Sequence, residues 1–391
     1  MDDLAQLTNA SATYNEIEEN GAPTTPLDFP DPVMGRAARV TANIFNPETG
    51  EEGSFPNIIY QIGDNGELPQ QAFWIGRKLK KAIYGCVRSC TILRLRDPVN
   101  QTWEITPQMA AVKLMDRNIV NQLRGRHIED PIKELSCSQF LSLGEDGEPQ
   151  RHPNVMSSLA VLQDDQYIYF FMPFCNCGEL FGYVERDGRF AEPVARHWFR
   201  QILGGIYYLQ KKGVCHRDMS LENLLVDRHA LALVIDMGMC LRVPFGSEDG
   251  SEPAIDVSGN TLRRLISPQT ACGKPNYISP EVLSSQVPFD GFAIDVWAAG
   301  VILFIMLIGL PPFDWASDDD PRFRMITNGR LVAMVRQWGR DISEDAGDLL
   351  QRMLTRDPSE RLSLMEVMDH RWIVTEPATP PTPPENEDWR H

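Results

Sequence analysis

The apolar pattern of this sequence changes its period once, and this change constrains the fold more than any other feature. From Phe73 to about Phe171 the segments are strand-like, with one helical stretch near Asp130 to Leu143. From Glu179 onward apolar residues recur at helical spacing, as between Pro193 and Lys212. We therefore predict an α+β fold with two lobes: a small β-rich N-lobe with one main helix, followed by a larger helical C-lobe.

The predicted folded domain covers residues 73–374, with an N-lobe at 73–172 and a C-lobe at 178–374. Residues 1–72 are rich in Pro, Asn, Glu and Gly without a sustained pattern, which predicts an acidic, largely disordered arm. A short β-rich patch from Ala38 to Phe45 could pack back onto the domain. Residues 375–391 are Pro-rich and acidic, which predicts a disordered tail and no calmodulin-binding helix.

The charge of the chain excludes some partners. The formal net charge is -17, and acidic residues dominate the stretch up to Phe73. This argues against a nucleic acid or an anionic membrane as a partner, because phosphate surfaces repel such a region.

The start lacks the apolar core of a secretory signal, and the longest apolar run, Val296 to Leu310, predicts a buried helix rather than a membrane span. The cysteines lack paired metal spacing, which indicates reduced thiols. We expect a cytoplasmic location, with the nucleus also open.

One predicted loop carries a candidate catalytic group. Asp218 and Asn223 stand five residues apart between an amphipathic helix and a short apolar strand, a spacing that can place a base beside a metal ligand. A second apolar strand leads into Asp236, and a carboxylate close to a glycine at a strand end suits metal binding. Upstream, Lys113 ends another strand, and Glu134 in the following helical stretch could pair with it.

Further blocks follow in a fixed order along the chain. They read GKPNYISPE at 273–281, DVWAAG at 295–300 and PPF at 311–313, and Arg361 comes after them. Together the blocks resemble the signature set of eukaryotic protein kinases of the serine/threonine type, closest to the calcium/calmodulin-dependent kinase-like group. The resemblance implies an enzyme that transfers the γ-phosphoryl group of ATP to Ser/Thr hydroxyls of protein substrates, with Mg²⁺ as a second cofactor.

The resemblance also assigns roles to single residues. Asp218 would orient the substrate hydroxyl or accept its proton, while Asn223 and Asp236 would hold Mg²⁺ on the phosphates. Lys113 would contact the α- and β-phosphates and would be held by Glu134. Five further positions would lie around the nucleotide: Gly85 and Val87 in the phosphate-covering loop, Met172 behind the adenine, Phe174 in the hinge, and Glu179 near the ribose.

The phosphate-handling residues depart from the kinase pattern in two places. The loop at 80–87 lacks two of three glycines, and Lys80 and Lys81 either meet phosphate by charge or point to solvent. Ser220 stands where kinases of this type carry a lysine, and Lys274 stands where a threonine is usual. Either Lys274 supplies the missing cation while Ser220 supplies the hydroxyl, or both positions drifted in a pseudokinase that acts as a nucleotide-binding scaffold or regulator. We favour compensation, because Lys113, Asp218, Asn223 and Asp236 are all present.

Substrate choice and regulation follow from the resemblance as well. Glu179 and Glu222 match acids that contact a basic residue three positions before the target serine, although solvated acids without this role remain the alternative. Arg217 would pair with a phosphate on the activation segment, the part of the chain that includes Thr270 and Lys274, and would thereby order it. Thr270 is the best-placed acceptor and Ser267 the second, so an upstream kinase is an expected partner.

Overall fold

The computed structural model describes residues 25–63, 65–144, 147–244, 255–257 and 261–381. These residues form two compact units. Residues 30–151 and 156–176 make a β-rich unit, and residues 25–29, 152–155 and 177–381 make a mainly helical unit. The predicted α+β fold with a β-rich part and a helical part is confirmed. The division falls between Asn176 and Cys177, inside the stretch that separates the two predicted lobes.

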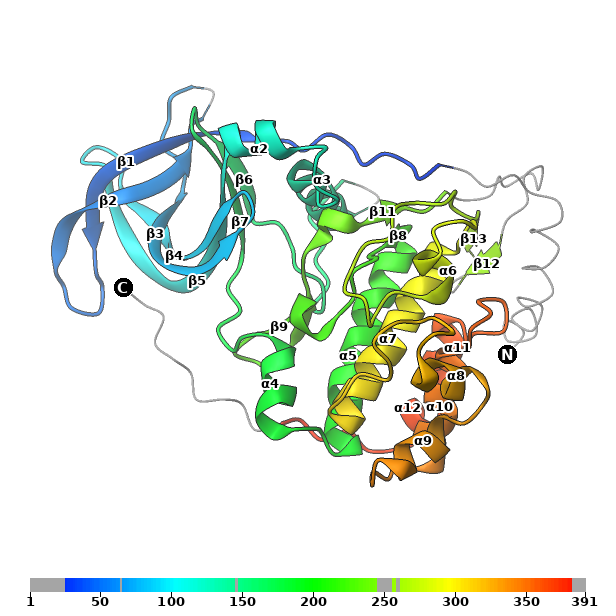
Figure 1. The fold of residues 1–391 in the computed structure, drawn as a ribbon. Helices are drawn as coiled ribbons and strands as arrows, with labels where there is room; N and C mark the ends of the chain where they lie inside the picture. The colour runs from blue at the N-terminus through cyan, green and yellow to red at the C-terminus, as the bar shows by residue number, and fades with distance from the viewer. Residues whose placement is uncertain (1–24, 64, 145–146, 245–254, 258–260, 382–391) are drawn as a thin grey trace, which may run out of the picture. The chain divides into compact units, whose positions relative to one another are not determined.

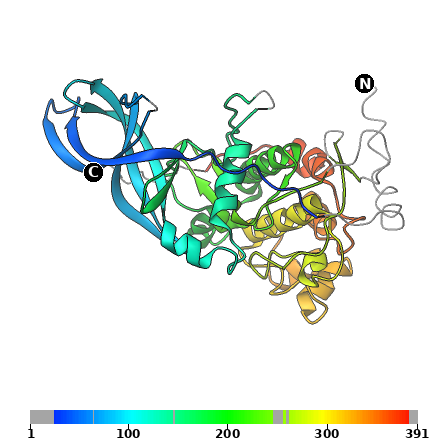
Figure 2. The ribbon, with the colours of Figure 1, turned by 90° about the horizontal axis from the view of Figure 1, so that it is seen from above.

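The β-rich unit is a closed barrel with the strand order β1-β2-β3-β4-β5-β7-β6, in which β1 also pairs with β5 and β6 (Figures 1 and 2). The strands are β1 Gly35–Phe45, β2 Glu52–Gln61, β3 Gln71–Ala82, β4 Gly85–Asp97, β5 Thr102–Asp116, β6 Ala160–Gln163 and β7 Tyr167–Pro173. Alternate side chains of each strand face the interior, where Phe73 stacks on Phe171 with 3.8 Å between ring centroids.

The prediction of a disordered arm over residues 1–72 is wrong for residues 35–61. These residues form β1 and β2, and the patch predicted at Ala38 to Phe45 lies within β1. Ile58 and Ile59 are fully buried, so the hairpin is part of the barrel core. The alternation of apolar and polar residues in these two strands is irregular in the sequence, because Asn57 adopts a φ of 66° and a register shift interrupts β1. Residues 1–24 of the predicted arm lie outside the described residues.

Two helices follow β5 in this unit: α2 Arg117–Leu123 and α3 Pro131–Leu141. Asp130 caps α3 by accepting hydrogen bonds from the amides of Ile132 and Lys133, and Pro131 occupies its first turn. The helical stretch predicted near Asp130 to Leu143 is therefore confirmed as α3.

The helical unit is built around α5 and α7, which lie side by side (Figure 1). Its helices are α4 Leu180–Asp187, α5 Glu192–Lys211, α6 Pro280–Leu283, α7 Gly291–Ile308, α8 Pro321–Thr327, α9 Leu331–Gln337, α10 Glu344–Met353, α11 Leu364–Asp369 and α12 Arg371–Val374. Helix α7 is long and apolar enough to cross a membrane by composition, but 94% of it is buried inside the structure, as the core helix of a folded domain would be.

The segments that connect the helices of this unit contain short strands and 3₁₀ turns. They are β8 Val214–Cys215, η2 Leu221–Asn223, β9 Leu224–Val226, β10 Ala232–Val234, η3 Met237–Met239, β11 Leu241–Arg242, β12 Ile255–Val257 and β13 Thr261–Arg263. Strands β9 and β10 pair with each other, and so do β8 and β11. These two small sheets fix both ends of the loop that holds Asp218.

The tail after Val374 is held in its first part. Arg196 and Arg200 of α5 donate hydrogen bonds to the carbonyls of Pro377 and Glu376, and the amide of Thr379 donates to Pro193. The predicted disorder of residues 375–391 is therefore wrong for 375–381. The remaining residues of the predicted tail lie outside the described part of the chain.

Candidate active site

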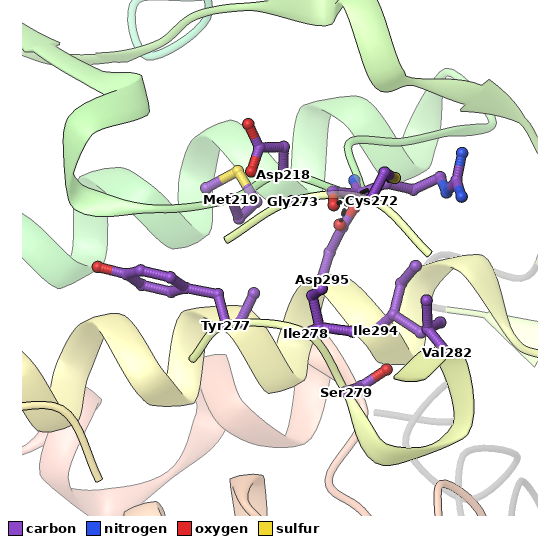
Figure 3. Close-up of a pocket in the computed structure, with 12 residues that line it drawn as sticks. Asp218, Met219, Cys272, Gly273, Tyr277, Ile278, Ser279, Val282, Ile294 and Asp295 are labelled. Atoms are coloured by element: carbon purple, nitrogen blue, oxygen red, sulfur yellow. Dashed lines mark hydrogen bonds between the residues drawn. The ribbon is translucent and has the colours of Figure 1, made fainter. Parts of the chain in front are cut away.

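The loop that follows β8 is anchored on the central helix α7. Asp295 of α7 is buried, and its two carboxylate oxygens accept hydrogen bonds from the backbone amides of His216, at 2.6 Å, and Arg217, at 2.9 Å. The side chain points from α7 towards the loop of Asp218 and Gly273 (Figure 3). Burial raises the pKa of Asp295, while His216 and the two amides act in the opposite direction. The anchor fixes the backbone immediately before Asp218.

Asp218 is held through one of its two carboxylate oxygens. The side-chain amide of Asn223 donates to Asp218 Oδ2 at 2.8 Å and to the Asp218 carbonyl at 2.7 Å. Oδ1 is buried and has no hydrogen-bond partner within the described residues. A Cβ at position 273 would lie 3.1 Å from Oδ1, and Gly273 has a φ of 94°, so glycine is required beside the carboxylate. The second oxygen therefore keeps its full capacity to accept a hydrogen bond or a proton, because no group of the described chain donates to it.

Ser220 and Lys274, the two positions that depart from the kinase pattern, are in direct contact. The ammonium of Lys274 donates a hydrogen bond of 2.7 Å to the hydroxyl of Ser220, which is fully buried. The Lys274 Nζ also lies 3.9 Å from a carboxylate oxygen of Glu222. The contact that the compensation hypothesis requires is therefore present. It brings the ammonium of Lys274, in the activation segment, against the loop that holds Asp218 and Ser220.

The protonation of Asp218 depends on this cation. Burial raises the pKa of Asp218, and Lys274 is the strongest of the groups that lower it, followed by His216 and the Asn223 hydrogen bond. The charge of Asp236 acts in the raising direction. Lys274 therefore keeps Asp218 closer to its ordinary ionised state.

Asn223 and Asp236 offer the oxygen ligands that Mg²⁺ prefers. The nitrogen of the Asn223 amide is used by Asp218, so its oxygen remains as a ligand atom. Asp236 adopts a left-handed φ of 68°, a strained conformation that is common where a side chain is aimed at a functional site. The donor set therefore fits a hard divalent cation such as Mg²⁺.

A small cavity of about 20 Å³ lies beside this loop (Figure 3). Its lining includes Met219, Cys272 and Ser279, and the buried hydroxyl of Ser279 has no hydrogen-bond partner in the described chain. A cavity of this size accommodates at most one water molecule. It is a packing gap of the loop and not the place of a substrate.

In the β-rich unit, the pairing predicted for Lys113 is confirmed. The Lys113 ammonium lies 2.6 Å from Glu134 of α3, and both side chains are buried. A second carboxylate, that of Glu129, lies 3.6 Å from the same ammonium. Sequence reasoning missed Glu129, because it precedes α3 in a loop where no spacing rule applies.

The predicted phosphate-covering loop is a tight hairpin turn between β3 and β4, in which Ala82 pairs with Gly85. A Cβ on Gly85 would lie 2.1 Å from the Leu114 carbonyl, so this glycine is required by the close approach of β5. Tyr84 at the turn is fully buried, and its hydroxyl donates to the Glu129 carbonyl at 2.9 Å. The turn is thus tied to the loop that precedes α3.

The other residues predicted to contact the nucleotide lie in or next to strands β4 and β7 and helix α4. Val87 stands opposite Lys113 in the ladder of β4 and β5, and Met172 stands opposite Ala111 in that of β5 and β7. Phe174 follows β7 and is half-buried, and Glu179 precedes α4. Lys80 and Lys81 are both exposed. The nucleotide roles of these residues stay predictions.

A buried ion pair completes the helical unit. Arg361 forms a bidentate pair with Glu281, with distances of 2.8 and 3.0 Å. The arginine has further hydrogen bonds to the carbonyls of Ala293 and Thr355, so its buried charge is well satisfied. The pair fixes the end of the activation segment to the rest of the unit.

The protein kinase domain family matches residues 107–373 of this chain, which therefore belongs to that family. A serine/threonine-protein kinase of Arabidopsis thaliana, CBL-interacting serine/threonine-protein kinase 9, is 32% identical over 69% of this chain and 53% of its own length. Calcium-dependent protein kinase 11 of the same plant is 32% identical over 82% of this chain and 57% of its own length. An Aurora kinase of Candida glabrata is 28% identical over 81% of this chain and 75% of its own.

This chain spans about half the length of the two plant relatives. Their similarity confirms the predicted resemblance to serine/threonine kinases of the calcium/calmodulin-dependent kinase-like group.

Replacing Lys274 should change the pH dependence of catalysis. A general base works above its pKa, and its activity is lost as the pH falls through that pKa. Since Lys274 lowers the pKa of Asp218, Lys274→Met should move the acidic limb of the kcat/KM profile to higher pH, whereas Lys274→Arg should leave it near the wild-type position. Profiles with the same acidic limb in all three proteins would show that Lys274 does not act on Asp218.

Proposed function

We propose that this protein is an ATP-dependent protein serine/threonine kinase. The observation that supports this best is the state of Asp218, which has one oxygen fixed by Asn223 and the other buried without a partner within the described residues. Asp218 also lies within the electrostatic influence of Lys274, whose ammonium contacts the neighbouring Ser220. A drifted, inactive site would not be expected to keep this arrangement of base, cation and hydroxyl.

In the proposed reaction the hydroxyl oxygen of a substrate Ser or Thr forms a bond to the γ-phosphorus of ATP. The bond from that phosphorus to the bridging oxygen of the β-phosphate breaks, and ADP leaves. The hydroxyl proton passes to the carboxylate of Asp218. Lys274 contributes a preorganised positive charge beside the base, where charge develops during the transfer.

The nucleotide is held by residues from several elements in this proposal. Lys113 contacts the α- and β-phosphates, and Glu134 keeps its ammonium in place. Asn223 and Asp236 hold Mg²⁺, which neutralises phosphate charge when it is bound. Met172, Phe174 and Glu179 line the adenosine. Gly85 belongs to the turn near the phosphates, and Val87 belongs to strand β4, which follows this turn.

The substrates proposed are proteins with a basic residue three positions before the target. Glu179 and Glu222 supply the negative charge for such a residue. Glu222 lies 3.9 Å from Lys274, so part of its charge is already balanced inside the protein. The preference should therefore be for one upstream basic residue rather than for several.

Phosphorylation of the activation segment is the proposed switch. The guanidinium of Arg217 donates to the Thr270 carbonyl at 2.8 Å, and its Nε is buried without a hydrogen-bond partner in the described chain. Thr270 is exposed, and Ser267 is half-buried. A phosphate on Thr270, written by an upstream kinase, would offer acceptor oxygens to Arg217, and Ser267 is the second candidate.

The proposed activity is tested by turnover of Mg²⁺-ATP on a mixed peptide library. Asp218→Asn keeps the shape of the side chain but removes the base, and should lower kcat by about 10²- to 10⁴-fold. Sequencing of the phosphorylated peptides reads out the preference for an upstream basic residue. A folded, phosphorylated wild type that shows no turnover, but a thermal shift with Mg²⁺-ATP, would identify a nucleotide-binding pseudokinase instead.

The proposed switch is tested by combining Thr270→Ala with Arg217→Ala. Each substitution should lower the activity of the phosphorylated protein, and the double variant should lose no more than either single one, because both remove the same contact. Ser267→Ala serves as the comparison for the second site. A phosphopeptide map of the active protein that lacks both Thr270 and Ser267 would remove this switch from the account.

A further inference from the structure

The segment before β1 has backbone hydrogen bonds near each of its ends, although nothing in its composition predicts them. We call residues 27–34 the N-terminal strap. At one end the Leu27 amide donates to the Arg242 carbonyl at 3.0 Å, and the Arg242 guanidinium donates to the Asp28 carbonyl at 2.6 Å. Leu27 thereby forms an antiparallel bridge with Arg242 on the outer side of β11, and β11 pairs with β8, which leads into His216.

At its other end the strap is bonded to helix α3 of the β-rich unit. The side-chain amide of Gln139 accepts a hydrogen bond from the Val33 amide at 2.8 Å and donates one to the Val33 carbonyl at 2.7 Å. One glutamine thus binds both backbone groups of a single residue, which fixes the direction of the strap as well as its position.

Met34 continues the same attachment by packing. It contacts the apolar cluster that contains Tyr84, Leu135 and Val120, which joins α2 and α3 to the barrel. Immediately afterwards β1 begins, and Gly35 and Arg36 pair with Leu162 and Gln163 of β6. Polar and apolar contacts of the strap therefore act together on the surroundings of α3.

Helix α3 carries Glu134, the partner of Lys113, so its position matters for nucleotide binding. The helix has only eleven residues, and a helix of this length depends on tertiary contacts for its stability. We propose that the N-terminal strap is a positioning element for α3: through Gln139 and Met34 it holds the helix where Glu134 can pair with Lys113. This proposal deepens the proposed function, because it assigns Gln139 and the strap to the nucleotide site through Glu134.

The part of the strap that precedes Val33 is stiff. Residues 29–32 read Phe-Pro-Asp-Pro, and each proline fixes its own φ and restricts the residue before it. A stiff segment loses less conformational entropy when Val33 and Met34 are bound than a glycine-rich segment of the same length would. This suits a segment whose role is to hold a helix rather than to move freely.

The proposal is tested by measuring the dissociation constant of Mg²⁺-ATP by calorimetry on the full chain. Gln139→Leu removes both hydrogen bonds and should weaken binding roughly five- to twentyfold, the scale of two lost neutral hydrogen bonds. Gln139→Glu keeps only the acceptor and should give an intermediate loss. Lys133→Ala, on the same helix, is the matched control and should change the dissociation constant less than twofold, about the effect of a neutral surface substitution.

A second background separates positioning from a general loss of stability. In Glu134→Gln the ion pair with Lys113 is already broken, so adding Gln139→Leu should weaken Mg²⁺-ATP binding no further. Equal additional weakening in this background, or no weakening by Gln139→Leu alone, would overturn the proposal. If Gln139→Leu does not fold, the same comparison of Mg²⁺-ATP binding, with and without Glu134→Gln, is made with Gln139→Glu and with Met34→Ala. Because the readout is binding, a wild type that binds Mg²⁺-ATP without turnover would refute the proposed activity while leaving this test intact.

Discussion

The arrangement of the catalytic loop depends on one buried carboxylate. Asp295 comes from the centre of α7, a helix with almost no exposed residue, and it accepts the amides of His216 and Arg217. An unpaired buried charge would be costly, so the loop and the helix stabilise each other only in this geometry. Arg217 is thereby held in a left-handed conformation, with a φ of 69°. The chain continues from this fixed point through Asp218, Ser220 and Asn223. Asn223 donates to Asp218, and Ser220 accepts from Lys274.

Under the compensation hypothesis, the exchange between Ser220 and Lys274 moves the catalytic cation from the loop of Asp218 to the activation segment. Lys274 follows Thr270 by four residues, and its ammonium contacts the Ser220 hydroxyl. Arg217 contacts Thr270 through its backbone carbonyl, and Gly273 passes close to Asp218. The ammonium that contacts Ser220, the carbonyl that Arg217 contacts and the glycine beside Asp218 therefore all belong to the short stretch 270–274.

Sequence reasoning reached the helical unit and the catalytic residues more fully than the barrel. The motifs around Asp218 and Asp236 have fixed spacings, because each is set by a loop between two short elements. The structure brings Asn223 against Asp218 and Lys274 against Ser220, as expected. The hairpin of β1 and β2 was missed because its burial depends on pairing with distant strands, and turn-forming residues interrupt its alternation. Glu129 and Gln139 were missed for a similar reason: their partners, Lys113 and Val33, are brought to them only by tertiary structure.

The central claim is that Lys274 has taken over the role of the missing loop lysine, and a double-mutant cycle tests it directly. The activities of Ser220→Lys, Lys274→Thr and the double variant should be compared with the wild type as kcat/KM for Mg²⁺-ATP and one peptide. Each single change should lower the rate, by about 10²- to 10³-fold where the cation is lost, and the double variant should recover most of it because it restores one cation and one hydroxyl in contact. Losses that simply add in the double variant would show that the two positions act independently, and would contradict the account.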